Sequence, residues 1–186
     1  QAALLRVVQE RQVAGLDLAG IKVMAAANPT STAADGGWLS AAAANRWAHL
    51  DWTVDPAYWV TGELAGWGQC LSANHAAVAS ICAAWITRSP GALLSLPSNA
   101  DDMGRAWPSP RSWSHAIRVL SVLPSGIHDR EALSLASACV GPAAANEWFT
   151  YILSLDLPNP EDLLAERVPM PSRGDQTLAA SLALVA

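Results

Sequence analysis

The chain has 186 residues, of which 52% are hydrophobic and only 15% are charged, and it carries a formal net charge of -5. This composition excludes a disordered chain. It indicates a folded protein that buries much of its surface in a core or in contacts with other subunits. The acidic balance argues against a nucleic-acid-binding protein that relies on a general basic face. The length suits one ample core or roughly one and a half small domains.

The sequence holds three scattered cysteines, Cys70, Cys82 and Cys139, without the spacing of a metal site or a redox motif. An odd number of thiols without a framework predicts a reducing, cytoplasmic setting in which the cysteines are small buried hydrophobic residues. No signal-peptide pattern is found, and no apolar run approaches the ~20 residues of a membrane span. We therefore expect a cytoplasmic protein without a membrane partner.

The first residues already follow a helical pattern, which predicts that the sequence is a piece of a longer protein. Gln1–Arg11 places Leu4, Leu5 and Val8 on one face of a helix. The glycine-flanked segment Val13–Ala19 predicts a small β-hairpin or loop.

The next stretch predicts a strand, a loop, a helix and a second strand. The short apolar run Ile21–Ala27 is typical of a strand in a covered parallel sheet, and Asn28, which precedes a proline, ends it. Leu39–Asn45 is the predicted helix, Arg46 follows it, and Trp47–Trp52 returns to an extended, aromatic pattern. Such a unit carries functional groups at the carboxyl edge of an α/β sheet.

The motifs AAANP, LS-x-A-x-ANRW and HLDW, in this order, resemble the second half of an AAA+ ATPase core, specifically the MoxR-like group. The segment LL-x-V-x-QER at the start resembles the helix that follows the Walker B strand. The resemblance implies that Asn28 is the sensor 1 residue, which orients the attacking water, and that Arg46 is the arginine finger. Each also has a structural alternative, since Asn commonly makes turns and a cation at a helix C-terminus is favourable by ~0.3–1 kcal/mol.

The remainder of the chain predicts a bundle of helices. Their expected bounds are Asp55-Pro56 to near Gly66, Ser72–Thr87, Ser109-Pro110 to before Pro124, Asp129–Val140, Gly141–Leu153, a short helix from Asn159-Pro160, and Asp175–Ala186. Leu93–Gly104 is expected to be a loop. Trp113, Ile117 and Leu120 form a predicted core stripe.

The expected fold is a fragment of an α/β P-loop NTPase (AAA+) core in residues 1–53, followed by an all-α helical lid in residues 54–186. The boundary is expected near Asp51–Asp55, and the chain is expected to be mostly α overall.

Arg111 lies in the first turn of a predicted helix, where a cation opposes the helix dipole and stands beside unsatisfied N–H groups. This arrangement becomes favourable once an anion binds. In AAA+ lids an arginine at this place is sensor 2, and the resemblance implies that Arg111 contacts the γ-phosphate of ATP. The alternative is a solvated side chain whose stem lies over Trp107 or Trp113.

The sequence contains no G-x-x-x-x-G-K-[ST] motif and no apolar strand that ends in Asp-Glu. The resemblance therefore implies that ATP and Mg²⁺ are bound mainly by residues upstream of this chain, which alone should not hydrolyse ATP. It also implies a ring, expected to be a hexamer, that remodels a protein client such as one with a von Willebrand A domain. Two alternatives stay open: a non-hydrolysing AAA+ relative, and a helical protein-interaction scaffold unrelated to ATP.

Overall fold

The computed structural model describes residues 5–28, 39–68, 72–124, 126–155, 157–158 and 160–184. The chain divides into two compact units, the first unit Gln1–Trp52 and the second unit Thr53–Ala186, and the division lies within Asp51–Asp55.

The regular elements of the first unit are short. They are the π-helical turn η1 Arg6–Glu10, the strands β1 Gln12–Val13 and β2 Leu16–Asp17, and the helix α2 Ala41–Ala44. The predicted hairpin is confirmed, with Val13 opposite Leu16 in an antiparallel pair. Its two central residues, Ala14 and Gly15, have φ values of 49° and 84°. Positive φ at both positions is typical of the two-residue turn whose twist matches that of the paired strands.

The prediction of two strands of a parallel sheet is wrong. Neither Ile21–Ala27 nor Trp47–Trp52 is a strand, and in the described part of the chain β1 and β2 are the only strands. A strand needs a hydrogen-bonded neighbour, and these segments have none among the described residues. Their apolar side chains are largely exposed, and those of Met24 and Trp52 each retain 93% of their accessible surface. The α/β core therefore stays a prediction, whereas the mostly helical character is confirmed.

All regular elements in the described part of the second unit are helical. Its elements are α3 Pro56–Leu64, η2 Gly66–Gly68, α4 Ala73–Arg88, η3 Pro90–Ala92, α5 Ala100–Met103, α6 Pro110–Leu120, α7 Arg130–Val140, α8 Pro142–Ser154, α9 Pro160–Leu164 and α10 Gly174–Ala183. Each predicted helix is present. The last one begins at Gly174, so the expectation that Asp175 caps it is wrong, and α5 interrupts the predicted loop.

Side-chain caps explain why most of these helices begin where they do. Asp55, Ser72, Ser109 and Asp129 each precede a helix and accept hydrogen bonds from backbone N–H groups of its first turn. Such a cap satisfies donors that the helix itself leaves unpaired. The sequence shows these residues directly, which is why the helix starts were predictable.

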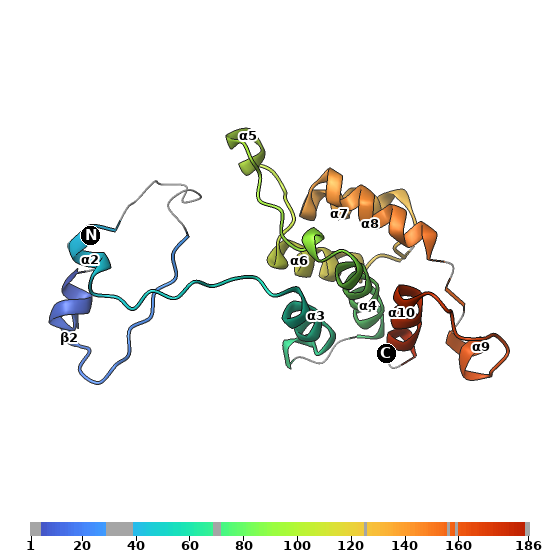
Figure 1. Ribbon diagram of the computed structural model, residues 1–186, viewed down its shortest axis with the longest axis horizontal. Coiled ribbons are helices and arrows are strands. Elements are labelled where there is room, and N and C mark those ends of the chain that lie inside the picture. Colours follow the sequence, from blue (N-terminus) through green and yellow to red (C-terminus); the bar gives the residue numbers. More distant parts are fainter. Residues whose placement is uncertain are drawn as a thin grey trace. The chain divides into compact units, whose positions relative to one another are not determined.

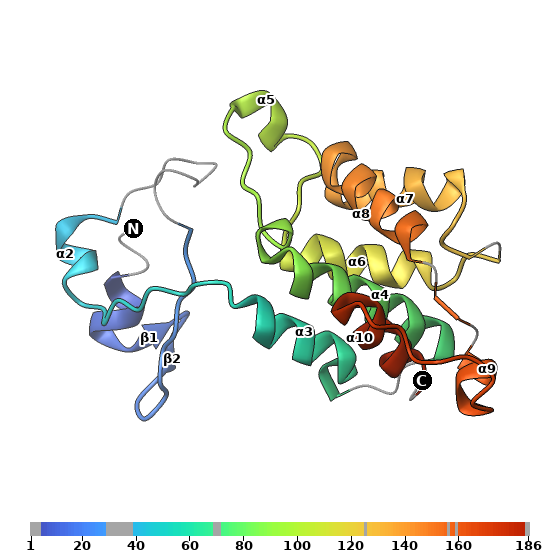
Figure 2. The same cartoon turned by 45° about the vertical axis from the view of Figure 1, so that its right-hand side comes forward.

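Helix α4 lies at the centre of the second unit. It contacts α3, α6, α8 and α10, and α7 packs against both α6 and α8. Half of its 16 residues are buried. Figures 1 and 2 show α4 beside α6 and α10, with α7 and α8 side by side.

Tryptophan side chains fill much of the core. Trp113 and Trp148 are fully buried and meet edge to face, with ring centroids 6.4 Å apart. The predicted stripe of Trp113, Ile117 and Leu120 is confirmed, since each is at most 1% exposed. Trp85 packs on Tyr151 at 5.2 Å between centroids. Aromatic pairs of this kind add to the stabilisation from burial itself.

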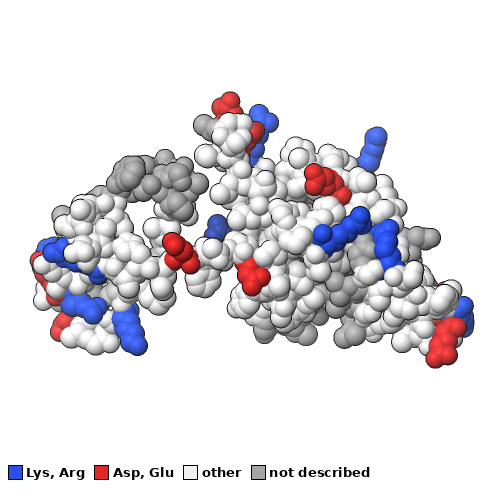
Figure 3. All heavy atoms as spheres, viewed as in Figure 1, with Lys and Arg blue, Asp and Glu red and all other residues white. Residues whose placement is uncertain are grey.

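The surface of the second unit carries few charges. Figure 3 shows Lys, Arg, Asp and Glu side chains scattered singly and in small groups, with uncharged surface between the groups on the face in view. Within the described residues, no helix has the length and apolar character needed to cross a membrane.

Candidate functional site

Asn28 closes the extended segment that follows the hairpin. Its side chain is exposed, and it makes no hydrogen bond within the described part of the chain. The residues after it, 29–38, lie outside the described residues. They include Asp35–Gly37, whose sequence predicts a turn. Asn28 is therefore accessible, as an amide that positions a water must be, although it does not end a strand.

Arg46 follows the short helix α2, as predicted. Its Nη1 donates a hydrogen bond to the carbonyl oxygen of Ala42, and His49 Nε2 donates to that of Ala44 over 2.9 Å. Arg46 thus pairs the Ala42 carbonyl near the C-terminus of the helix, whereas the Ala44 carbonyl also accepts a hydrogen bond from Trp47 N over 3.2 Å. The guanidinium is exposed and has further donors, so this contact leaves it able to bind a second acceptor.

Arg111 occupies the second position of α6, after a well-formed cap. Ser112 N donates to Ser109 Oγ over 3.1 Å, and Ser109 N donates to Ser112 Oγ over 2.8 Å. Pro110 takes the first helical position. The Arg111 side chain is exposed and forms no ion pair with any described residue. An arginine that projects beside the N–H groups of a helix start forms a positive site suited to an anion.

The three predicted residues are divided between the units. Asn28 and Arg46 belong to the first unit, and Arg111 belongs to the second.

Glu63 is a buried acidic residue that the sequence analysis did not single out. It lies on α3 and is 4% exposed. Its Oε1 accepts a hydrogen bond from Trp67 Nε1 over 2.8 Å and another from Ser114 Oγ on α6. The Trp67 ring lies against Gly62, where an added Cβ would be 2.4 Å from ring atoms. The spacing of Gly62, Glu63 and Trp67 was the available signal.

The two described cysteines, Cys82 and Cys139, are not suited to nucleophilic catalysis or metal binding. Burial raises the pKa of the Cys82 thiol, the negative charge of Glu63 adds to this, and the Trp148 indole opposes it. Burial also raises the pKa of Cys139, which is half-buried. A thiol that stays protonated is a poor nucleophile and a poor metal ligand. Cys70 lies outside the described residues. Among the rest, no group of three His, Cys, Asp or Glu side chains could hold a metal ion.

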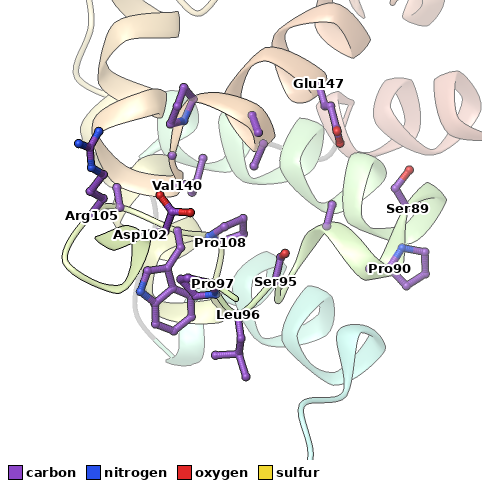
Figure 4. A pocket seen from close by; sticks show the side chains of 18 residues that line it. Ser89, Pro90, Ser95, Leu96, Pro97, Asp102, Arg105, Pro108, Val140 and Glu147 are labelled. Carbon is purple, nitrogen blue, oxygen red and sulfur yellow. The ribbon is translucent and has the colours of Figure 1, made fainter. Parts of the chain in front are cut away.

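A cavity of about 600 Å³ opens on the second unit. It lies between η3, the beginning of α8 and a protruding arm, Leu94–Pro108, that carries α5 near its tip (Figures 1 and 4). From the sequence, only an irregular loop was expected in this region. The prolines and Trp107 that flank α5 were the available signal of a structured segment.

The chain was compared with models of protein families, with characterised proteins and with solved structures, and none of the three comparisons returned a match.

Proposed function

We propose that this chain is the C-terminal part of a MoxR-like AAA+ ATPase. In the intact protein, ATP binding and hydrolysis in a ring, a hexamer, would drive chaperone-like remodelling of a protein client, such as one with a von Willebrand A domain. The proposal is supported by the order of the AAANP, ANRW and HLDW motifs ahead of a helical bundle. The observation that carries it is that Arg111 is exposed in the first turn of α6 and forms no ion pair with any described residue.

Three residues would act on the γ-phosphate. Asn28 would hold the attacking water without adding negative charge, and Arg111 would link the position of the helical lid to the nucleotide. Arg46 would reach the ATP of a neighbouring subunit, where a guanidinium that offsets transition-state charge accelerates hydrolysis by about 10³–10⁵-fold. ATP and Mg²⁺ would be held mainly by Walker A and B residues upstream, so this chain alone would be inactive.

The test is ATP turnover by the longer protein that contains this chain. Arg46→Ala should lower turnover by roughly 10³-fold or more, whereas Lys22→Ala, which removes another exposed cation of the first unit, should not. Mixing the Arg46→Ala subunit with subunits that keep Arg46 but lack the P-loop lysine should restore part of the activity, because the finger acts between subunits. Unchanged turnover in Arg46→Ala would reduce Arg46 to a helix-end residue.

Arg111 needs a separate comparison because it would act by binding. Arg111→Ala should raise the KM for ATP, while Arg118→Ala, at the other end of the same helix, should leave it unchanged. If both substitutions raise the KM equally, the cause is the general loss of positive charge, and Arg111 does not act as sensor 2.

A helical interaction scaffold is the second candidate. It is favoured by the hydrogen bond from Arg46 to Ala42, which gives this arginine a structural role, and by the lack of strand structure in Ile21–Ala27. A non-hydrolysing AAA+ relative would share this scaffold role. Absence of ATP binding by the longer protein would favour the scaffold, and binding without turnover would favour the non-hydrolysing relative.

A further inference from the structure

The cavity beside α8 has walls that the core holds in place. Ser95 N donates to Pro108 O over 3.1 Å, which ties the two ends of the arm together. Trp113 Nε1, from the core, donates to Ala92 O over 2.9 Å, next to the start of the arm. A cavity that exists before its ligand arrives binds with less loss of conformational entropy.

Gly141 fixes the side of the cavity where the arm meets α8. Its φ is 83°, and an added Cβ would lie 2.6 Å from the carbonyl oxygen of Ala106. Only glycine permits this approach, so the returning part of the arm lies directly on the start of α8. Ser112 Oγ donates to Trp107 O over 2.9 Å and ties the same part of the arm to α6.

Most of the cavity wall is apolar. Residues with apolar side chains that line it include Pro90, Leu96, Pro97, Trp107, Pro108 and Val140. Its volume lies within the ~300–1,000 Å³ that is usual for ligand sites with apolar walls. A ligand must therefore offer apolar groups of its own.

Three charged side chains line the same cavity. Asp102 accepts a hydrogen bond from Asn99 Nδ2 over 2.7 Å. Arg105 and Glu147 form no ion pair within the described part of the chain. Figure 4 shows them at separate ends, with Val140 and Pro108 between them. The cavity thus presents the Arg105 guanidinium and the Asp102 carboxylate toward one end and the Glu147 carboxylate toward the other, across an apolar middle.

We propose that this cavity binds a short apolar peptide that carries a positive group at the Glu147 end and a negative group at the Arg105 end. The apolar side chains would lie against Leu96, Pro97 and Trp107. The two charges can come from the free termini of a short peptide or from Lys and Asp or Glu side chains that flank an apolar segment of a partner protein. Nothing in this proposal depends on ATP, so it stands or fails separately from the ATPase function.

The first test asks whether peptides bind in the cavity, by calorimetric titration of the full chain. The probes are Leu-Ala-Leu with free termini and acetyl-Lys-Leu-Ala-Leu-Asp-amide. Ala143→Trp, at an exposed position of α8 that lines the cavity, should fill the space and weaken binding at least about tenfold. Ala138→Trp, at an exposed position of α7 outside it, should not. Binding of either probe supports the proposal, and which one binds identifies the source of the charges.

The second test asks whether the charges select the peptide. Glu147→Lys should make the chain prefer a blocked peptide with Asp at both ends, and Arg105→Glu one with Lys at both ends, each by about 3- to 10-fold. The matched reversals Glu131→Lys and Arg118→Glu lie outside the cavity and should leave the preference unchanged. The proposal is overturned if neither probe binds, if Ala143→Trp binds as tightly as wild type, or if the charge reversals do not change the preference.

Discussion

Ser114 on α6 donates a hydrogen bond to the carboxylate of Glu63 on α3, although the two residues are 51 positions apart in the chain. The same carboxylate oxygen accepts from Trp67 Nε1 at 2.8 Å. Glu63 is buried and has no cationic partner among the described residues. Two neutral donors therefore replace the water that this carboxylate loses on folding, and they join α3, η2 and α6.

Glu63→Ala should lower the free energy of unfolding by about 1–3 kcal/mol, because the indole and the hydroxyl both lose a charged acceptor. Urea unfolding of the full chain measures this. Glu63→Gln keeps an acceptor oxygen and should be less destabilising. Glu131→Ala removes an exposed acid of α7 and should change the stability by less than about 0.5 kcal/mol. Equal stability of Glu63→Ala and wild type would show that the buried contact contributes nothing.

Gly141→Ala should destabilise the chain for two reasons. The backbone of Gly141 has φ 83° and ψ 156°, a region that costs other residues about 1–3 kcal/mol. The new methyl group would also meet the Ala106 carbonyl at 2.6 Å. Gly91→Ala is the matched control, since Gly91 has no positive φ and no atom within 4 Å of the added Cβ. Chemical unfolding of both variants should separate them, and similar midpoints would contradict the close approach of the arm to α8.

Cys82 should make the stability fall as the pH rises above about 8.5, the ordinary pKa of a thiol. Burial raises the pKa of Cys82 in the folded chain, so there the thiol keeps its proton while the unfolded chain loses it. The folded state then binds more protons, and the free energy of unfolding decreases by up to about 1.4 kcal/mol per pH unit.

Cys82→Ala is the control for this pH effect. Unfolding curves between pH 7 and 10 should show a flatter decline in this variant than in wild type. Cys139→Ala, which removes a half-buried thiol, should change the slope less. If the slopes of Cys82→Ala and wild type agree, the Cys82 thiol does not stay protonated in the fold.

The parts of the fold that were predictable depend on neighbouring residues. A cap such as Asp55 or Ser72 lies next to the helix that it begins. Trp113, Ile117 and Leu120 follow the i, i+4, i+7 spacing of one helix face within α6. The strand prediction for Ile21–Ala27 failed because an apolar run does not say whether a partner strand or a cover is present. Among the described residues, no strand pairs with Ile21–Ala27.

The candidate sites likewise divide into residues that neighbouring sequence predicts and residues that depend on distant contacts. Arg111 was predictable as the second residue of a capped helix, because that position follows from Ser109 and Pro110 alone. Glu63 was not, since its hydrogen bond with Ser114 joins α3 to α6 across four intervening helical elements. The cavity depends on Gly141 meeting the arm at Ala106, which is a contact between residues far apart in sequence.

The second unit should fold without the first. Every residue of the buried hydrophobic cluster, from Trp59 to Ala179, belongs to Thr53–Ala186. In contrast, Met24, Leu50 and Trp52 are each at least 89% exposed, so the described part of the first unit buries few large apolar side chains. Since burial of apolar surface is the main favourable term in folding, the unfolding transition should come from the second unit.

A chain shortened to residues 53–186 should therefore unfold cooperatively at the same temperature as the whole chain, within about 2 °C, by circular dichroism or calorimetry. Limited proteolysis of the whole chain should cut first within residues 1–52, because exposed segments that bury little surface open most easily. Leu120→Ala, which leaves a space in the core of the second unit, is the positive control and should lower the midpoint clearly. A large drop on truncation would show instead that the first unit covers apolar surface of the second.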